Sequence, residues 1–309
     1  MKVFVAGASG AIGGPLVAAL VAAKHEVIGM TSRDAGIKEL REKGMEGVVV
    51  NALDAEAVRA ETARIRPDAI IDELTSLPKR YTPEEMRTAA PGDRRIRLEG
   101  GGNLHRAAIE TGVKRYIVQS TGFFYGRGEG LASEGDPLAH DASPGIAGSV
   151  ATYTQIENRV FSSPGPVGIA LRYGFFYGPG TYHDPESGSI SEQLRQRQYP
   201  VIDPATGVFS FIHVEDAAAA SVAALEIRPG VYNIVDNDPV ALAVWLPAFA
   251  SFIGAPPPPH ISDKAAIQTG GPDRVYYATQ LRGASNEKAK KEFGFAPRRL
   301  EWLQGIAST

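Results

Sequence analysis

The chain has 309 residues, of which 43% are hydrophobic and 22% charged, as in an ordinary globular protein. A net charge of −3 at pH 7 argues against binding to nucleic acid or to an anionic membrane. The absence of cysteine excludes disulfides and cysteine nucleophiles, and the six histidines are too scattered to indicate a metal site. The first strand begins at Lys2 and no apolar run is long enough to span a membrane, so we expect a cytoplasmic protein.

The N-terminal segment has the pattern of a dinucleotide-binding turn. A short apolar run ends in three glycines spaced three apart, and the helix-like residues 15–24 follow at once. Gly7 allows a sharp turn, Gly10 lets a pyrophosphate approach the backbone, and Gly13 lets the helix pack closely. The anion would accept hydrogen bonds from the free N–H groups at the helix N-terminus. We therefore predict that the cofactor is bound by Gly7, Ser9, Gly10, Ala11, Ile12 and Gly13.

The end of the second predicted strand, residues 26–30, indicates which cofactor is bound. NAD-binding folds usually place an acid about 20 residues after the glycines to hold the ribose 2′-hydroxyl, whereas an arginine there accommodates the 2′-phosphate of NADP. Here Ser32 and Arg33 precede the first acid, Asp34, so the sequence favours NADP(H) over NAD(H). Alternatively, Arg33 is a solvated residue at the start of the next helix and Ser32 is its cap.

The following segments continue the alternation of strand and helix. Strands are predicted at residues 47–50 and 68–72, and residues 98–121 predict a helix capped by Gly112 and then a fifth strand. This rhythm predicts an α/β fold with parallel strands joined by right-handed crossovers. Ligands bind beyond the carboxyl ends of such strands.

Four motifs and the glycine spacing resemble those of the extended and atypical short-chain dehydrogenase/reductases, which include nucleotide-sugar epimerases and dehydratases. Residues 119–126 are similar to the Ser-Ser-Ser-x-x-x-Tyr-Gly segment of that family, and residues 172–180 to its Arg-x-x-x-x-Tyr-Gly-Pro-Gly turn. Residues 209–217 are similar to its Phe-x-His-Val-x-Asp segment, and residues 281–297 to its closing motif. The resemblance therefore runs nearly end to end.

The resemblance implies a Rossmann-type, doubly wound parallel sheet with a smaller C-terminal α/β lobe. The cofactor domain would span residues 1–180, with a strand returning near 208–235, and residues 181–309 would mainly bind the substrate. It also implies cofactor contacts near the adenine, along the fourth strand and at the nicotinamide end. These contacts would come from Leu53, Asp54, Leu74, Thr75, Ser120 and Tyr177. Asp54 could instead serve only as a helix N-cap.

The catalytic pair of the family is altered in this chain. Thr121 falls at the position of the substrate-binding Ser or Thr, but the family's Tyr-x-x-x-Lys has no direct match. If Tyr153 is the family tyrosine, the lysine has become Glu157. In a second alignment, Glu157 matches a glutamate that family members often carry four residues after their motif lysine. Tyr153 then stands at the position of that lysine, and Ser149 stands at the position of the family tyrosine. The second alignment fits the downstream spacing better, and both break the pair.

Acid–base chemistry still allows one role for Tyr153. A phenol with a pKa of about 10 is a proton donor at neutral pH, and a carboxylate one helical turn away would disfavour tyrosinate. We therefore predict an NADP-dependent reductase that acts on a carbonyl or a conjugated double bond of a small organic molecule, with Thr121 and Tyr153 as catalytic residues. Alternatively, Tyr153 only packs or contacts the cofactor. The protein is expected to act as a monomer or homodimer.

Two other functions stay open. A nucleotide-sugar epimerase or dehydratase would need a pocket ringed by arginine, for which Arg195, Arg197 and Arg282 are available. A catalytically silent NADP-binding sensor is compatible with the broken pair. Four aromatic residues would wall an apolar substrate pocket or belong to the core, namely Phe123, Phe124, Phe175 and Phe176. The resemblance implies an architectural His213, although a general base is conceivable.

Overall fold

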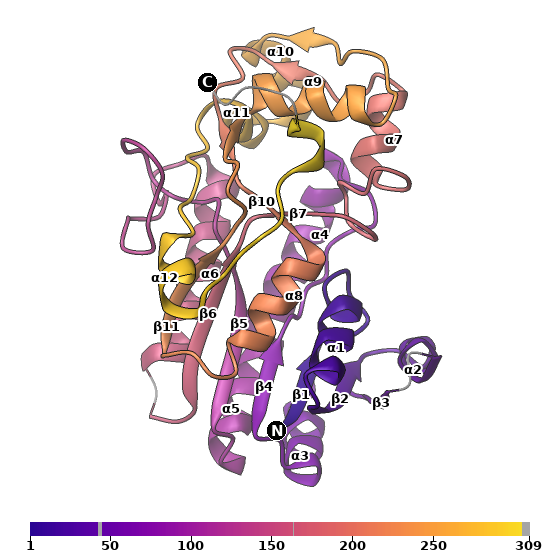
Figure 1. Ribbon diagram of the computed structural model, residues 1–309, viewed down its shortest axis with the longest axis vertical. Coiled ribbons are helices and arrows are strands. Elements are labelled where there is room, and N and C mark those ends of the chain that lie inside the picture. The colour runs from indigo at the N-terminus through magenta and orange to yellow at the C-terminus, as the bar shows by residue number, and fades with distance from the viewer. Residues whose placement is uncertain (43–44, 163, 305–309) are drawn as a thin grey trace.

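A seven-stranded, all-parallel sheet in the order β11-β6-β5-β4-β1-β2-β3 organises the chain. The computed structural model describes residues 1–42, 45–162 and 164–304 (Figure 1). The sheet strands are β1 (Lys2–Ala6), β2 (Glu26–Thr31), β3 (Glu46–Val49), β4 (Ala69–Asp72), β5 (Arg115–Thr121), β6 (Val167–Tyr173) and β11 (Gly230–Ile234). The strand order reverses between β1 and β4, which opens a crevice at the carboxyl ends of these two strands. The predicted doubly wound α/β fold is confirmed.

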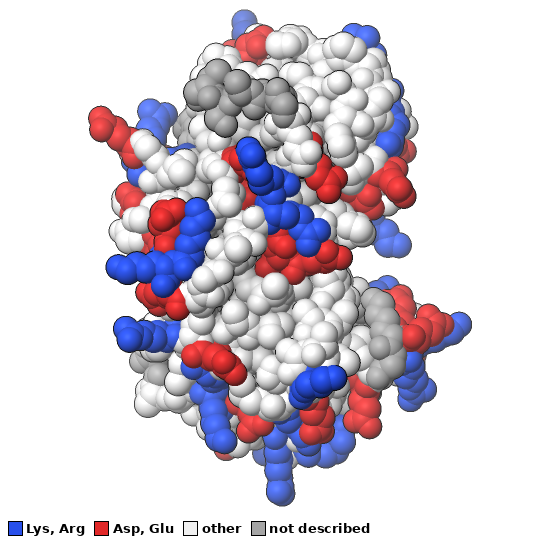
Figure 2. Space-filling model, in the orientation of Figure 1, with Lys and Arg blue, Asp and Glu red and all other residues white. Residues whose placement is uncertain are grey.

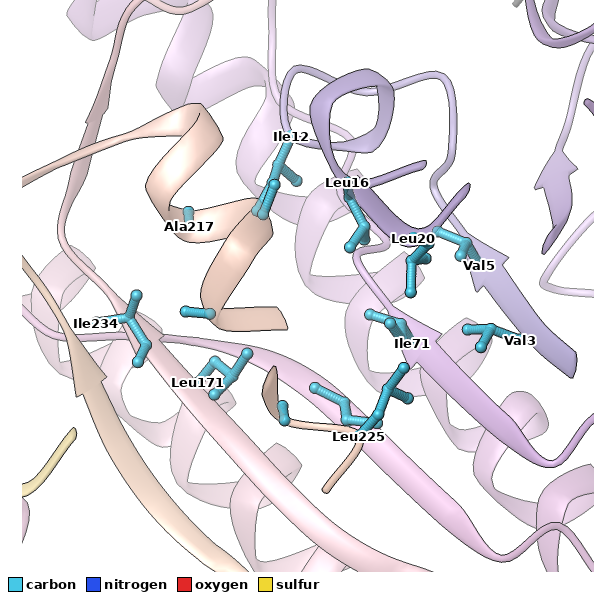
Figure 3. Packing of buried hydrophobic residues seen from close by; sticks show 14 of the residues in the cluster. Val3, Val5, Ile12, Leu16, Leu20, Ile71, Leu171, Ala217, Leu225 and Ile234 are labelled. Atoms are coloured by element: carbon cyan, nitrogen blue, oxygen red, sulfur yellow. The ribbon is translucent and has the colours of Figure 1, made fainter. Parts of the chain in front are cut away.

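Helices cover both faces of the sheet, because alternate residues of each strand point to opposite sides. One face packs against α1 (Gly13–Ala22) and α8 (Val214–Ala223), through residues such as Leu16 and Ala217 (Figure 3). The other face packs against α3 (Ala55–Ile65), α5 (Gly101–Thr111) and α6 (Pro144–Ser162). Burial of each aliphatic side chain in these layers contributes about 1.5–3 kcal/mol. The edge helices are α2 (Asp34–Glu42), α4 (Pro83–Arg95) and α12 (Glu287–Phe293).

A second lobe lies beyond the carboxyl ends of the strands, at the top of Figure 1. Its core is built around aromatic side chains that include Phe211, Trp245 and Phe249. The helical elements are α7 (Ser189–Arg195), α9 (Leu242–Phe252), α10 (Asp263–Gly270), α11 (Pro272–Thr279) and the 3-10 turn η2 (Glu301–Leu303). The short strands at this end are β7 (Phe175–Tyr177), β8 (Val201–Ile202), β9 (Val208–Phe209), β10 (Phe211–His213), β12 (Val240–Ala241) and β13 (His260–Ile261).

The segment that leads into α5 departs from a regular helix. Gly112 adopts the left-handed conformation and ends α5, as predicted. At the other end, residues Ile96–Gly100 form a π-helical turn, η1, between α4 and α5. Such turns are frequent at functional sites because they re-aim side chains out of the helical register. This turn points Arg97 toward the crevice.

Two further features concern the surface. Acidic and basic side chains are interspersed on the face drawn in Figure 2. Across residues 1–42, 45–162 and 164–304, no helix combines the length and hydrophobicity needed to cross a bilayer.

Candidate functional site

The carboxyl ends of the strands and the second lobe enclose a cleft of about 1270 Å³. It brings together eleven of the residues predicted to bind cofactor or substrate, although they are spread over nearly half of the chain. These are Gly7, Ser9, Gly10, Ala11, Ser32, Arg33, Leu74, Thr75, Ser120, Thr121 and Tyr153. The remaining predicted residues, Ile12, Gly13, Leu53, Asp54 and Tyr177, are not part of its wall.

The glycine loop is held so tightly that two of its positions have no room for a side chain. A Cβ on Gly7, where φ is +82°, would lie 2.5 Å from the carbonyl oxygen of Glu73. A Cβ on Gly13 would lie 2.5 Å from the carbonyl oxygen of Ala8. Gly10, whose N–H donates to the Gly7 carbonyl over 2.9 Å, has a looser environment and lines the cleft. These glycines therefore form a cradle that fits a pyrophosphate at the N-terminus of α1.

The residues predicted at the ribose 2′-position are exposed and face the cleft. Because α2 begins at Asp34, Arg33 rather than Ser32 occupies the N-cap position. The guanidinium of Arg33 makes no ion pair or hydrogen bond with another described residue. An exposed, unpaired arginine at this position is available to a phosphate group.

The predicted residues outside the cleft wall have structural partners. Asp54 Oδ1 accepts a hydrogen bond from the Ala57 N–H over 3.0 Å and caps α3. Tyr177 is buried, and its ring packs edge-on against His213 and Trp302, at centroid distances of 5.0 and 4.9 Å. His213 itself caps α8 through Nδ1, which accepts from the Glu215 N–H.

Two hydroxyl groups without partners lie on the sheet side of the cleft. Thr121, at the end of β5, has a buried Oγ1 that makes no hydrogen bond with any described residue. Tyr153 is half-buried on α6, and its hydroxyl also makes no hydrogen bond within the described part of the chain. Buried polar atoms are usually paired, so hydroxyls left free at a cleft indicate places where a ligand supplies the partner.

Glu157 is engaged elsewhere and does not act on Tyr153 as the sequence led us to expect. Its carboxylate accepts from Arg172 through Nε at 2.8 Å and Nη2 at 2.7 Å, and from the Ser120 hydroxyl at 2.6 Å. The Arg172 guanidinium therefore neutralises the Glu157 carboxylate. The pKa of Tyr153 is raised, but burial is the main cause and Asp93 is the acidic neighbour that adds to it.

A cation does lie beside Tyr153, and it comes from a different element. The Cζ atom of Arg97, in η1, is 5.2 Å from the centre of the Tyr153 ring. Arg97 is buried and held by Asp93, with Nε to Oδ2 at 2.7 Å, and by Gln119, with Nη1 to Oε1 at 3.2 Å. Its charge lowers the pKa of Tyr153 and so opposes the effect of burial. Sequence reasoning missed this residue, because only the π-helical turn aims it at α6.

Glu73 is a further acidic residue of the cleft, and it follows β4 and lies under the glycine loop. Burial raises its pKa to about 8, and Oε2 has no hydrogen-bond partner among the described residues. Oε1 accepts from the Tyr173 hydroxyl over 3.1 Å. From the sequence, the acidic pair of Asp72 and Glu73 at the end of the fourth strand favours a capping role over a catalytic one. In the part of the chain that the structure describes, no three His, Asp or Glu side chains are grouped so that they could hold a metal ion.

The Rossmann sheet, the glycine cradle and the adjoining cleft define a dinucleotide-binding enzyme. Residues 3–234 match the NAD dependent epimerase/dehydratase family, and the chain belongs to that family. The protein is an NAD(P)-dependent enzyme of the oxidoreductase type. The resemblance to the extended short-chain dehydrogenase/reductases is confirmed.

A curated relative and two solved structures show what this chain resembles. A 3-diazoavenalumate denitrifying reductase from a Streptomyces species is 36% identical over 309 residues, covering 99% of both chains. The UDP-glucose 4-epimerase of Thermotoga maritima, solved with UDP-glucose, is 19% identical with a TM-score of 0.77, covering 98% of this chain and 95% of that one. The UDP-glucose 4-epimerase of Thermus thermophilus, solved with NAD, is 23% identical with a TM-score of 0.72, covering 99% and 100%.

Proposed function

We propose that the protein is an NADPH-dependent reductase that acts on a carbonyl or conjugated double bond of a small organic molecule. The observation that carries the proposal is the meeting of two unpaired hydroxyls, those of Thr121 and Tyr153, with the glycine cradle in one cleft. The relative with 36% identity is itself a reductase, which supports the same class of reaction. When bound, the reduced nicotinamide supplies the hydride.

The side chains then have distinct roles. Thr121 donates a hydrogen bond to the substrate oxygen and orients it. Tyr153, kept protonated by burial, gives its proton to that oxygen as the carbon gains hydride. The tyrosinate left behind is stabilised by Arg97 until solvent returns a proton. Since the tyrosine starts as an acid, reduction is favoured over the reverse reaction at neutral pH.

The preference for NADPH rests on Arg33. Its guanidinium is exposed at the cleft and unpaired among the described residues, and no acid precedes it after β2. A 2′-phosphate would offer this arginine a charge-assisted, bidentate partner.

The arginines of the C-terminal half do not support a nucleotide-sugar substrate. None of Arg195, Arg197 and Arg282 lines the cleft. Arg195 donates to the Pro185 and Glu186 carbonyl oxygens, and Arg282 pairs with Asp136.

Cofactor binding and turnover test the proposal together. Purified protein would be titrated with NADPH and NADH, and NADPH oxidation followed on a panel of carbonyl compounds for wild type, Thr121→Ala and Tyr153→Phe. We expect tighter binding of NADPH and loss of turnover in both variants. Thr154→Ala is the matched control, because its hydroxyl is also buried without a partner but lies outside the cleft wall. Tight binding without any turnover would instead support the sensor function.

A further inference from the structure

The cleft has an aromatic wall on the side away from the glycine loop. The loop follows β1, whereas Phe123 follows β5 and Phe175 follows β6, on the other side of β4 in the sheet order. The rings of Phe123 and Phe175 stack with centroids 4.2 Å apart, and those of Phe175 and Phe209 lie 4.7 Å apart. Phe123 and Phe175 are only half-buried. One face of each ring is covered by the other, and the part that stays exposed lines the cleft.

Four phenol groups complete this wall. They come from four separate segments of the chain and are Tyr81, Tyr153, Tyr199 and Tyr277. All four are half-buried, and none of their hydroxyls makes a hydrogen bond with a described residue. None of the four is among the hydroxyls that are sealed from solvent, so their oxygens are accessible within the cleft. Four accessible hydroxyls beside one aromatic wall are available to hydrogen-bond a bound ligand.

The hydroxyls can act only as neutral groups at physiological pH. Burial raises the pKa of Tyr199 to about 12 and also raises those of Tyr81 and Tyr277. The three groups are close enough that ionisation of one disfavours ionisation of its neighbour. Each phenol is therefore available as a hydrogen-bond donor.

We propose that this part of the cleft binds a flat aromatic or conjugated molecule that stacks on Phe123 and Phe175 and presents oxygen or nitrogen acceptors to the phenols. Ring stacking rewards a planar, unsaturated ligand beyond its buried area. Hydrogen bonds from Tyr199 and Tyr277 would fix its orientation, with the reacting group beside Tyr153. This substrate class rests on the proposed function for the chemistry, but the binding can be measured without turnover.

Calorimetric titration of the NADP⁺-saturated protein tests the inference, since the oxidised cofactor prevents reduction. The probe is cinnamaldehyde, and the comparison ligands are its cyclohexyl analogue, in which only the ring is saturated, and UDP-glucose. We expect cinnamaldehyde to bind roughly five-fold tighter than the cyclohexyl analogue. UDP-glucose should not bind. Equal affinity of the two aldehydes, or no binding of cinnamaldehyde, would overturn the proposal.

Single hydroxyl deletions locate the contact. The single carbonyl oxygen of cinnamaldehyde is placed beside Tyr153, so this test uses 3,4-dimethoxycinnamaldehyde, whose ring oxygens can accept from the other phenols. Tyr277→Phe and Tyr199→Phe should each weaken its binding roughly three- to ten-fold, the effect of one lost hydrogen bond. Tyr276→Phe is the matched control: it neighbours Tyr277 but lies outside the cleft wall, and its hydroxyl faces the Tyr125 carbonyl at 3.5 Å. Unchanged binding in both cleft variants would refute the phenol contacts.

Ligand affinity and NADPH oxidation, measured on the same preparation, distinguish a failure of this inference from a failure of the proposed function. Aromatic selectivity without NADPH oxidation would remove the reductase proposal and leave the aromatic site intact. If the protein reduced saturated and aromatic aldehydes alike and bound them with equal affinity, the reductase proposal would stand and the aromatic site would be refuted.

Discussion

Replacement of Arg97 by methionine should slow the reductase by making tyrosinate at position 153 harder to form. The methionine keeps most of the length of the side chain and removes the positive charge that lies 5.2 Å from the centre of the Tyr153 ring. At an effective dielectric constant of about 20, two unit charges about 5 Å apart attract by about 3 kcal/mol, so loss of the cation disfavours the tyrosinate. The Asp93 carboxylate, 2.7 Å from Arg97 Nε, offsets part of this field. We therefore expect kcat to fall by roughly ten- to a hundred-fold.

The effect of Arg97→Met is measured on NADPH oxidation and on the ionisation of Tyr153. Steady-state NADPH oxidation gives kcat and KM, and ultraviolet difference titration at alkaline pH follows tyrosine ionisation. Because the chain has 11 tyrosines, each titration is compared with the same protein carrying Tyr153→Phe. The isolated Tyr153 curve should move to higher pH in Arg97→Met and stay near its original position in Arg97→Lys. Thermal unfolding of both variants checks that the hydrogen bond to Gln119 is not required for folding.

If Tyr153 ionised at the same pH in wild type and in Arg97→Met, the guanidinium would have no electrostatic influence on the phenol. A loss of activity that Arg97→Lys failed to restore would indicate that the shape of the guanidinium matters rather than its charge.

Three other properties can be tested in the same way. Arg33→Ala should weaken NADPH binding roughly ten-fold or more and leave NADH affinity unchanged, because only NADPH offers a 2′-phosphate; an equal loss for both cofactors would contradict this. Glu157→Gln leaves Arg172 buried without its counter-ion, so urea denaturation should show a loss of about 3–5 kcal/mol in the free energy of unfolding. A loss below about 1 kcal/mol would argue against a structural role for the pair. The pKa of Glu73 rises from 4.5 to about 8 on folding, so the unfolded chain binds fewer protons between these values and stability falls as the pH rises through this window. Glu73→Gln should flatten this fall in urea titrations at several pH values, and an unchanged slope would exclude Glu73 as its origin.

Most of the cofactor cradle could be predicted because its determinants are local. The turn after β1 needs glycine for a positive φ at Gly7 and for close approach at Gly13, and both requirements are set by neighbours within a few residues or by the next strand. The alternation of strands and helices along the chain then predicts which edge of the sheet carries the carboxyl ends of the strands. For the same reason, Arg33 could be placed at the cleft from its distance along the chain alone.

The surroundings of Tyr153 could not be predicted, because they depend on contacts between distant segments. The sequence placed Glu157 one turn from Tyr153 and suggested that its charge would act on the phenol. In the fold, β6 brings Arg172 to Glu157 and neutralises it. A π-helical turn, for which no local signal was found, brings Arg97 to the Tyr153 ring instead.

The amino-acid sequence by itself therefore determined the family, the sheet and the glycine turn after β1, because glycine spacing and the alternation of hydrophobic residues act over short distances. Only the tertiary structure decided which charges and unpaired hydroxyls surround the cleft. Tyr81, Tyr199 and Tyr277 lie in segments with no common motif, and they meet because the second lobe folds back over the ends of the sheet. A pocket made from side chains that lie 78 to 196 residues apart along the chain has no signature in the spacing of those residues.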